Sequence, residues 1–134
     1  MNDTVLQAIR DGVVGVDTAG VIEVWNADAE RLLGFTAEDA VGQTLALIIP
    51  PESRPAHIAG FHRAMETGRT DTQGAPALVA ATGKHGPVEL EITIGVRRSL
   101  PGEAPHGTVA VLRGAGERRS LESYAASALR EGGV

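Results

Sequence analysis

The side chains of this sequence best suited to chemistry lie in the stretch HIAGFHRAMETG, residues 57 to 68. Its spacing predicts a helix with His57, Phe61 and Ala64 on one face, because residues three, four and seven apart share a side of an α-helix. His57 lies in the first turn, where the positive end of the helix dipole disfavours an imidazolium ion. A neutral imidazole on an inward face is a ligand for iron. The alternative is a histidine that packs or donates a hydrogen bond at the start of the helix, the commoner use of an isolated histidine.

Other combinations of reactive side chains predict no catalytic site. His57 and His62 are five residues apart and do not share a helical face as the two histidines of a zinc site do. Glu89 and Glu91 fall on the outward face of a strand, a position typical of solvated carboxylates rather than of an acid–base pair. The sequence has no cysteine, which excludes disulfides, thiolate nucleophiles and cysteine-ligated zinc. No Ser-His-Asp set or phosphate-binding glycine loop stands out, so we do not expect an enzyme.

The composition predicts one globular domain. The chain has 134 residues, of which 43% are hydrophobic, enough for a single core. The formal net charge is −5, and no run of basic residues occurs, which argues against a nucleic-acid or anionic-membrane surface. No apolar run approaches the roughly 20 residues that span a bilayer. We therefore expect a cytoplasmic domain, either a whole protein or part of a longer one.

The first half of the chain predicts a hairpin followed by short helices. The segment VVGVDTAGVIEVW reads as two strands around the turn DTAG, with Val14 and Val16 facing Ile22 and Val24. Asn26 follows as the expected N-cap of a short helix, which it would tie to the hairpin.

The second half predicts one longer helix and three strands. The helix extends from about residue 54 to 67 and ends at Gly68. A second hairpin follows, in which APALVAAT (75–82) and VELEITIGVRR (88–98) flank the turn around GKHGP. Strict alternation from Val88 to Val96 gives it one apolar face. The segment TVAVLR predicts a last strand, and GERRSLESYAASALREGG a terminal helix.

This order of elements predicts an α+β fold. Strands gathered at both ends of the chain, with helices between them, favour an antiparallel sheet whose helices cover one face. The space between that face and the longest helix is the natural place for a ligand cavity.

The same segments together resemble PAS sensor domains. DTAGVIEVWNADAERLLGF is similar to their first hairpin and helix, TAEDAVGQTLALIIP to the next turns, and HGPVELEITIGV to their penultimate strand. The resemblance covers residues 4–116 and implies a five-stranded antiparallel sheet with helices on one face, flanked by N- and C-terminal helices. The implied organisation is an N-terminal helical cap (1–12), a PAS domain (13–114) and a C-terminal signalling or dimerisation helix (115–134).

The segment PPESRPAHIAGFHRAMETG resembles the haem PAS domains of bacterial oxygen-sensing histidine kinases. This resemblance implies haem b, with His57 as the proximal iron ligand and Arg63 on a propionate. Where those kinases have an arginine that hydrogen-bonds oxygen, this chain has Ala77 or Leu78, which makes carbon monoxide, nitric oxide or redox sensing as well supported as oxygen sensing. The expected haem contacts are Phe61, Met65, Leu78, Leu90, Ile92, Val109 and Val111.

The resemblance also implies what the domain does with its partners. PAS domains sense or pair, so we expect a homodimer that controls an effector domain or partner protein. The alternative is a cofactor-free interaction and dimerisation module with a filled core. Without cysteine, the covalent adducts of light-oxygen-voltage domains and of photoactive yellow protein relatives are impossible. Gly114 replaces the acid of the Asp-x-Thr bridge by which such domains commonly reach their output helix.

Overall fold

A computed structural model describes residues 11–115 and confirms the predicted α+β fold. The helices expected within residues 1–10 and 116–134 lie outside the described residues. In chain order the elements are β1 (Gly12–Val16), β2 (Ile22–Trp25), α2 (Ala27–Leu33), α3 (Ala37–Ala40), the 3-10 helices η1 (Leu45–Ile48) and η2 (Pro51–Ser53), α4 (Arg54–Thr67), β3 (Ala77–Gly83), β4 (Gly86–Arg97) and β5 (Gly107–Gly114).

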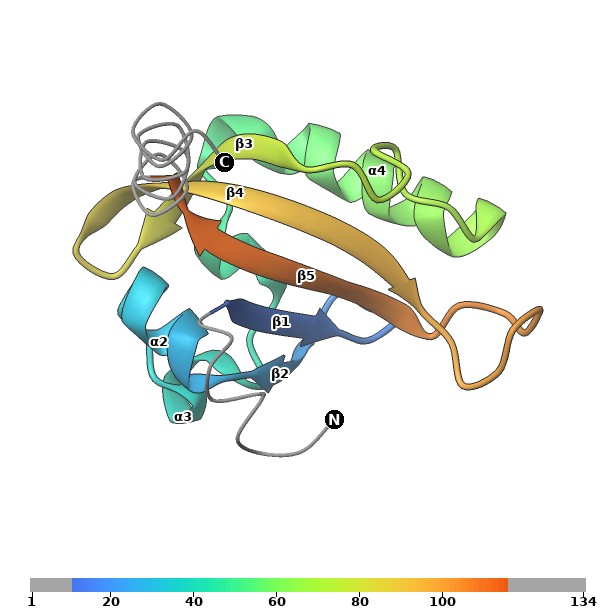
Figure 1. Cartoon of the computed structure of the whole chain (residues 1–134), viewed down its shortest axis with the longest axis horizontal. Helices are drawn as coiled ribbons and strands as arrows, with labels where there is room; N and C mark the ends of the chain where they lie inside the picture. Colours follow the sequence, from blue (N-terminus) through green and yellow to red (C-terminus); the bar gives the residue numbers. More distant parts are fainter. Residues whose placement is uncertain (1–10, 116–134) are drawn as a thin grey trace, which may run out of the picture.

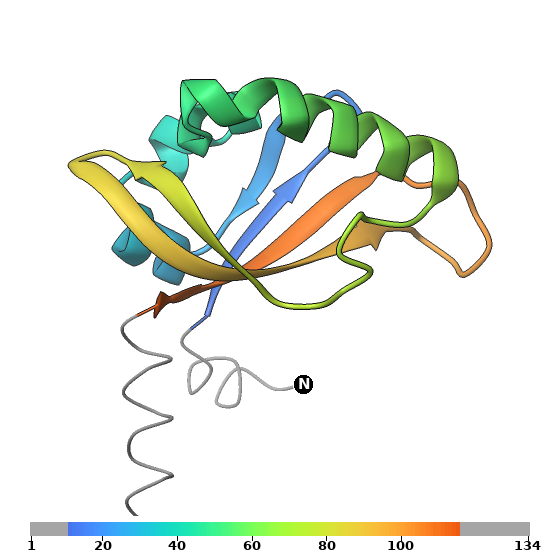
Figure 2. The same cartoon turned by 90° about the horizontal axis from the view of Figure 1, so that it is seen from above.

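The five strands form one antiparallel sheet in the order β2-β1-β5-β4-β3 (Figure 1). The longest pairing joins β4 to β5, from Leu90 opposite Gly114 to Arg97 opposite Gly107. The helices gather on one side of the sheet, and α4 crosses above β3, β4 and β5 (Figure 2). We call the side that faces α4 the inner face and the opposite side the outer face.

Asn26 joins the first strand to the first described helix. Its side-chain oxygen accepts hydrogen bonds from the backbone N–H groups of Val13 and Ala29, both at 2.9 Å. Its amide nitrogen donates to the carbonyl of Asp11 at 3.1 Å. The same side chain therefore caps α2 and fixes the start of β1, as the sequence predicted.

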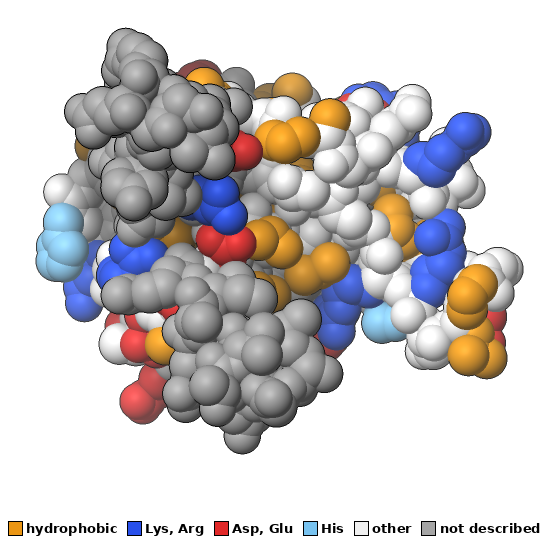
Figure 3. All heavy atoms as spheres, viewed as in Figure 1, with side chains coloured by type: hydrophobic (Ala, Val, Ile, Leu, Met, Phe, Trp, Pro, Cys, Tyr) orange, Lys and Arg blue, Asp and Glu red, His pale blue; other side chains and the backbone are white. Residues whose placement is uncertain are grey.

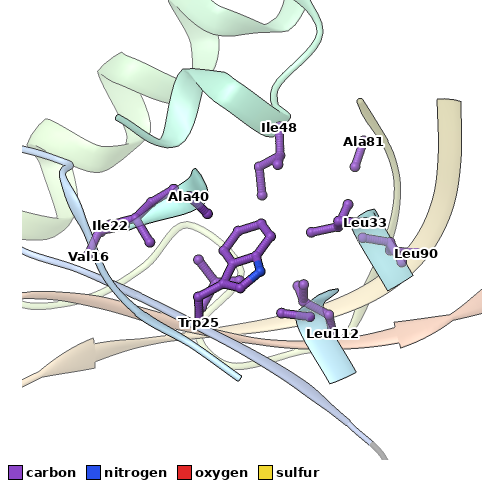
Figure 4. Close-up of a cluster of buried hydrophobic side chains, with 11 residues drawn as sticks. Val16, Ile22, Trp25, Leu33, Ala40, Ile48, Ala81, Leu90 and Leu112 are labelled. Atoms are coloured by element: carbon purple, nitrogen blue, oxygen red, sulfur yellow. The ribbon is translucent and has the colours of Figure 1, made fainter. Parts of the chain in front are cut away.

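The tightly packed core lies at the end of the sheet nearest α2 and η1. Trp25 is 6% exposed, and its indole N–H donates to the carbonyl of Phe35 at 2.9 Å. Leu33, Ile48 and Leu112 surround the ring (Figure 4). By contrast, α4 buries only Ala64 completely, so this helix is not packed into the core along its length.

One predicted pairing in the first hairpin was wrong. A register shift between Gly15 and Val16 pairs Gly15 with Val24 and Val16 with Ile22. Val24 therefore lies with Gly15 on the outer face, where it is 39% exposed. Such an irregularity changes which side chains share a face, because side chains in a strand alternate with a period of two.

Candidate functional site

A cavity of about 540 Å³ lies between the inner face of the sheet and α4. We call it the sheet–helix cavity. This volume is within the range of small-molecule sites in proteins, about 300–1,000 Å³. Its lining is mainly apolar and comes from Val14, Val16, Leu45, Ile48, Ile49, Pro50, Glu52, Ser53, Ala56, His57, Gly60, Phe61, Ala64, Thr70, Asp71, Thr72, Ala77, Val79, Ala80, Ala81, Leu90, Ile92, Ile94, Thr108, Ala110 and Leu112.

Helix α4 forms one wall of the cavity, and its inward face combines two ring side chains with two small residues. His57, Gly60, Phe61 and Ala64 follow one another at spacings of three or four residues and line the cavity together. Gly60 has no side chain and Ala64 only a methyl group, so both leave room for a ligand on this wall. The helix ends at Gly68, whose φ of 74° is the left-handed conformation that glycine adopts without strain.

The opposite wall comes from alternate residues of the strands. In β4 these are Leu90, Ile92 and Ile94, and the neighbouring β5 contributes Ala110 and Leu112. Ala110 is paired with Ile94 across the two strands, so their side chains share the inner face. Ala77 in β3 is equally short. The cavity exists because small residues stand on both walls, on α4 and on the sheet.

His57 is the one imidazole in this described lining. It also borders a surface groove of about 320 Å³, which shares Leu45, His57 and Phe61 with the sheet–helix cavity. Burial lowers the pKa of His57, because the charged imidazolium loses hydration. The ring is therefore neutral at physiological pH, as metal ligation requires.

Arg63 lies outside the cavity lining and is held by Asp71. Its Nη2 donates a hydrogen bond to Asp71 Oδ2 at 2.7 Å, and its Nε donates one to Asp71 Oδ1 at 3.2 Å. The guanidinium therefore binds both carboxylate oxygens. Hydrogen bonding from Arg63 lowers the pKa of Asp71, so the carboxylate stays ionised. The resemblance had assigned Arg63 to a haem propionate, but in this structure its charge is already neutralised by a protein side chain.

The structure brings together four of the predicted site residues. His57, Phe61, Leu90 and Ile92 line the sheet–helix cavity. Met65 is half-buried but is not part of the described lining.

The placement of Leu78, Val109 and Val111 in the cavity was wrong. Leu78 is paired with Glu91 and Val111 with Thr93, so both belong to the outer face. Val109 pairs with Gly95 on the same face. Their neighbours Ala77, Val79, Ala110 and Leu112 line the cavity instead. The physical reason is the period of two in a strand, by which a one-residue change moves a side chain to the other face.

Several lining residues were missed by sequence reasoning. Thr70, Asp71 and Thr72 come from the loop after α4, which has no periodic pattern to place its side chains. Ala110 and Leu112 could have been found by pairing β5 with β4, because residues opposite the inward-facing Ile94 and Ile92 also face inward.

Comparison with known proteins agrees with this architecture. The profile of the PAS fold family matches residues 1–113. The chain belongs to the PAS family. PAS domains are typically sensory modules rather than catalysts. This chain is therefore a sensory domain of a signalling protein.

Individual relatives are distant from this PAS domain. The sensor protein FixL of Bradyrhizobium diazoefficiens is 27% identical over 92 residues, which are 66% of this chain and 18% of that protein. A PAS domain from Colwellia psychrerythraea has a TM-score of 0.67 at 21% identity, covering 86% of this chain and 99% of the other. The PAS domain of the RpfR quorum-sensing receptor of Cronobacter turicensis, in complex with C12:0, has a TM-score of 0.59 at 14% identity, covering 80% and 95%. These likenesses support the five-stranded PAS fold.

The described part of the chain contains neither a membrane-spanning helix nor a cluster of acidic, histidine or cysteine side chains for a metal. Between residues 11 and 115, no helix combines the length and the apolar character needed to cross a membrane. Within the same residues, no three His, Cys, Asp or Glu side chains are grouped so that they could hold a metal ion.

Proposed function

We propose that this PAS domain senses a small molecule that enters the sheet–helix cavity. The observation that carries the proposal is the mainly apolar space of about 540 Å³ between α4 and the sheet, which stays open directly beside the buried core. Apolar surface removed from water gives about 25 cal/mol per Å², so an apolar ligand would gain affinity from this lining.

Ligand occupancy would act by changing the packing of α4 against β4 and β5. A ligand shifts a conformational equilibrium only by as much as it binds the two states differently. Here one state has α4 separated from the sheet by the ligand, and the other has α4 closer to Ile92 and Ala110. Because β5 is the last strand of the described residues, its position is the simplest way to pass the change to an effector or partner protein.

Haem b is the first candidate ligand, and His57 is the residue that would hold its iron. The neutral imidazole in the cavity wall supports this candidate. A porphyrin brings four nitrogen ligands of its own to the iron, which would suit a site that offers a single imidazole. The bound iron would supply the gas-binding or redox chemistry. The propionates fit less well, because Arg63 is paired with Asp71 and the described lining contains no lysine or arginine.

Titration with haemin tests the haem candidate. If His57 ligates the iron, wild-type protein gives a sharp Soret band of a histidine-ligated haem, and His57→Ala weakens haem binding at least about tenfold. His62→Ala is the matched control, because His62 is an exposed histidine of the same helix. An unchanged Soret band in His57→Ala, or no haem binding by the wild type, would eliminate this ligand and leave other apolar molecules. The C12:0 complex of RpfR is a precedent for such a ligand in the same fold.

We also propose a homodimer formed through the outer face of the sheet. Val24, Val111 and Leu78 are 39%, 38% and 65% exposed there. Figure 3 shows apolar side chains on this side of the sheet, viewed as in Figure 1. This surface supports the alternative function as well, in which the domain is an interaction module that binds no cofactor. The effector or partner controlled by the dimer would be a signalling protein.

Light scattering measures the proposed dimer. Val111→Glu places a charge on the outer face and should halve the molar mass, because burying an unpaired carboxylate in an interface is costly. Leu100→Glu is the matched control, since Leu100 is 61% exposed in the loop between β4 and β5. A monomeric wild-type protein, or a dimer that persists in Val111→Glu, would contradict this interface.

A further inference from the structure

We propose that Asp71 sets the charge preference of the sheet–helix cavity, which selects an uncharged amphipathic molecule over an anionic one. Asp71 does this by holding the guanidinium of Arg63 away from the ligand. The inference rests on the proposed function, since it concerns which class of molecule the cavity binds.

The charges of the cavity lining favour a neutral ligand. Glu52 and Asp71 are its charged residues, and the described lining includes no arginine or lysine. His57 is neutral. A carboxylate brought into this space would lose hydration without gaining a positive partner, and such a loss is costly in an apolar environment.

The ion pair lies against the wall of the cavity rather than far from it. Gly60 lines the cavity, and a Cβ atom built on it would be 3.2 Å from Asp71 Oδ2 and 3.7 Å from Arg63 Nη2. A larger residue at position 60 would therefore press on the pair. It follows that the guanidinium of Arg63 is within a side-chain movement of the cavity once Asp71 releases it.

The loop after α4 fixes Asp71 in this place. The hydroxyl of Thr70 donates to the carbonyl of Ile94 in β4 at 3.3 Å, and the N–H of Gln73 donates to the carbonyl of Thr70 at 3.0 Å. Gln73 has a φ of 51°, a left-handed conformation that is uncommon for a residue other than glycine. Because the backbone on both sides of Asp71 is held, its carboxylate remains available to Arg63.

The pair contributes to ligand choice rather than to the fold. Both side chains are exposed, at 55% for Arg63 and 59% for Asp71, and exposed ion pairs stabilise proteins little. Removal of the carboxylate should therefore leave the domain folded. An arginine without its partner offers a planar pair of N–H donors that matches a ligand carboxylate.

Two probes with the same chain length test the inference, 1-decanol and decanoate, measured by isothermal titration calorimetry. At about pH 8 decanoate is ionised, because carboxylic acids titrate several units lower. We expect the wild type to bind 1-decanol at least about tenfold more tightly than decanoate, and Asp71→Asn to reduce this ratio at least about tenfold through new contacts of Arg63. Asp28→Asn is the matched control, because it removes the same charge from an ion pair with Arg31 in α2.

A double variant separates the released arginine from the lost negative charge. Asp71→Asn/Arg63→Gln should regain a preference for 1-decanol, since no guanidinium remains to bind the carboxylate. Equal binding of both probes by the wild type, or an unchanged ratio in Asp71→Asn, would overturn the role of Asp71 while leaving the ligand cavity in place. Failure of both probes to bind any variant would overturn this inference, and the haemin titration then decides whether the cavity function fails with it.

Discussion

Replacing Ala110 by phenylalanine will abolish ligand binding while the domain stays folded. Ala110 is a half-buried residue of β5 whose side chain lines the sheet–helix cavity opposite α4. A phenyl ring at this position would occupy the space that the ligand needs, so binding would require its displacement. We expect the affinity for 1-decanol to fall at least about 100-fold, and titration calorimetry measures the loss.

Stability distinguishes a filled cavity from a damaged core. In a tightly packed core, an inserted ring costs about 1–3 kcal/mol, whereas in an open apolar cavity it gains buried surface. Ala110→Phe should therefore unfold at a denaturant concentration no lower than the wild type. Val111→Phe is the matched control, since the adjacent residue lies on the outer face and should leave ligand binding unchanged. Retained affinity in Ala110→Phe would place the ligand outside this cavity.

Replacing Asn26 by alanine will cause the largest loss of stability of the substitutions considered for this domain. The side chain accepts hydrogen bonds from Val13 and Ala29 and donates one to Asp11. Its removal leaves partly buried backbone groups without these bonds and removes the cap of α2. We expect the free energy of unfolding to fall by about 2–4 kcal/mol, measured by urea denaturation.

Asn26→Asp is the informative comparison for this prediction. Aspartate keeps the oxygen that accepts from Val13 and Ala29, and its charge is favourable at the N-terminus of a helix. It loses only the donor to the carbonyl of Asp11. The loss of stability should therefore be well below that of alanine. Equal losses in the two variants, or a loss under about 1 kcal/mol in alanine, would contradict the role of Asn26 as the joint between β1 and α2.

Periodic patterns in the sequence were sufficient to predict the fold and one wall of the site. The helix of residues 54–67 and its end at Gly68 agree with α4. The spacing from His57 to Phe61 placed both on the cavity face. In β4, polar residues alternate with apolar ones, so the inner positions of Leu90 and Ile92 could be read directly.

The same reasoning failed where both faces of a strand are apolar. In β5, Val109 and Val111 alternate with Ala110 and Leu112, so hydrophobicity alone does not say which pair faces inward. The prediction places Val109 and Val111 at the ligand, but pairing with Gly95 and Thr93 puts them on the outer face. Leu78 is in the same situation within the run from Ala77 to Val79. Strand register, which depends on long-range pairing, decides these positions.

The partner of Arg63 could not be predicted from the helix that carries it. Helical spacing gives the position of Arg63 on α4, but Asp71 lies in a loop whose path depends on the left-handed Gln73 and on the bond from Thr70 to Ile94. Thus the resemblance implied a haem contact for a residue that the loop has already paired. The cavity therefore offers a ligand the imidazole of His57, whereas the positive charge of Arg63 is held by Asp71.

Crystallography of the purified domain under xenon pressure tests the central claim most directly, because xenon enters apolar cavities that exclude water. The account predicts xenon density between α4 and the sheet, bordered by Phe61, Ala64, Ile92 and Ala110, or density of a retained ligand in the same place. A wild-type crystal in which these side chains pack directly against one another, with no xenon or ligand between them, would contradict the sheet–helix cavity and every ligand assigned to it.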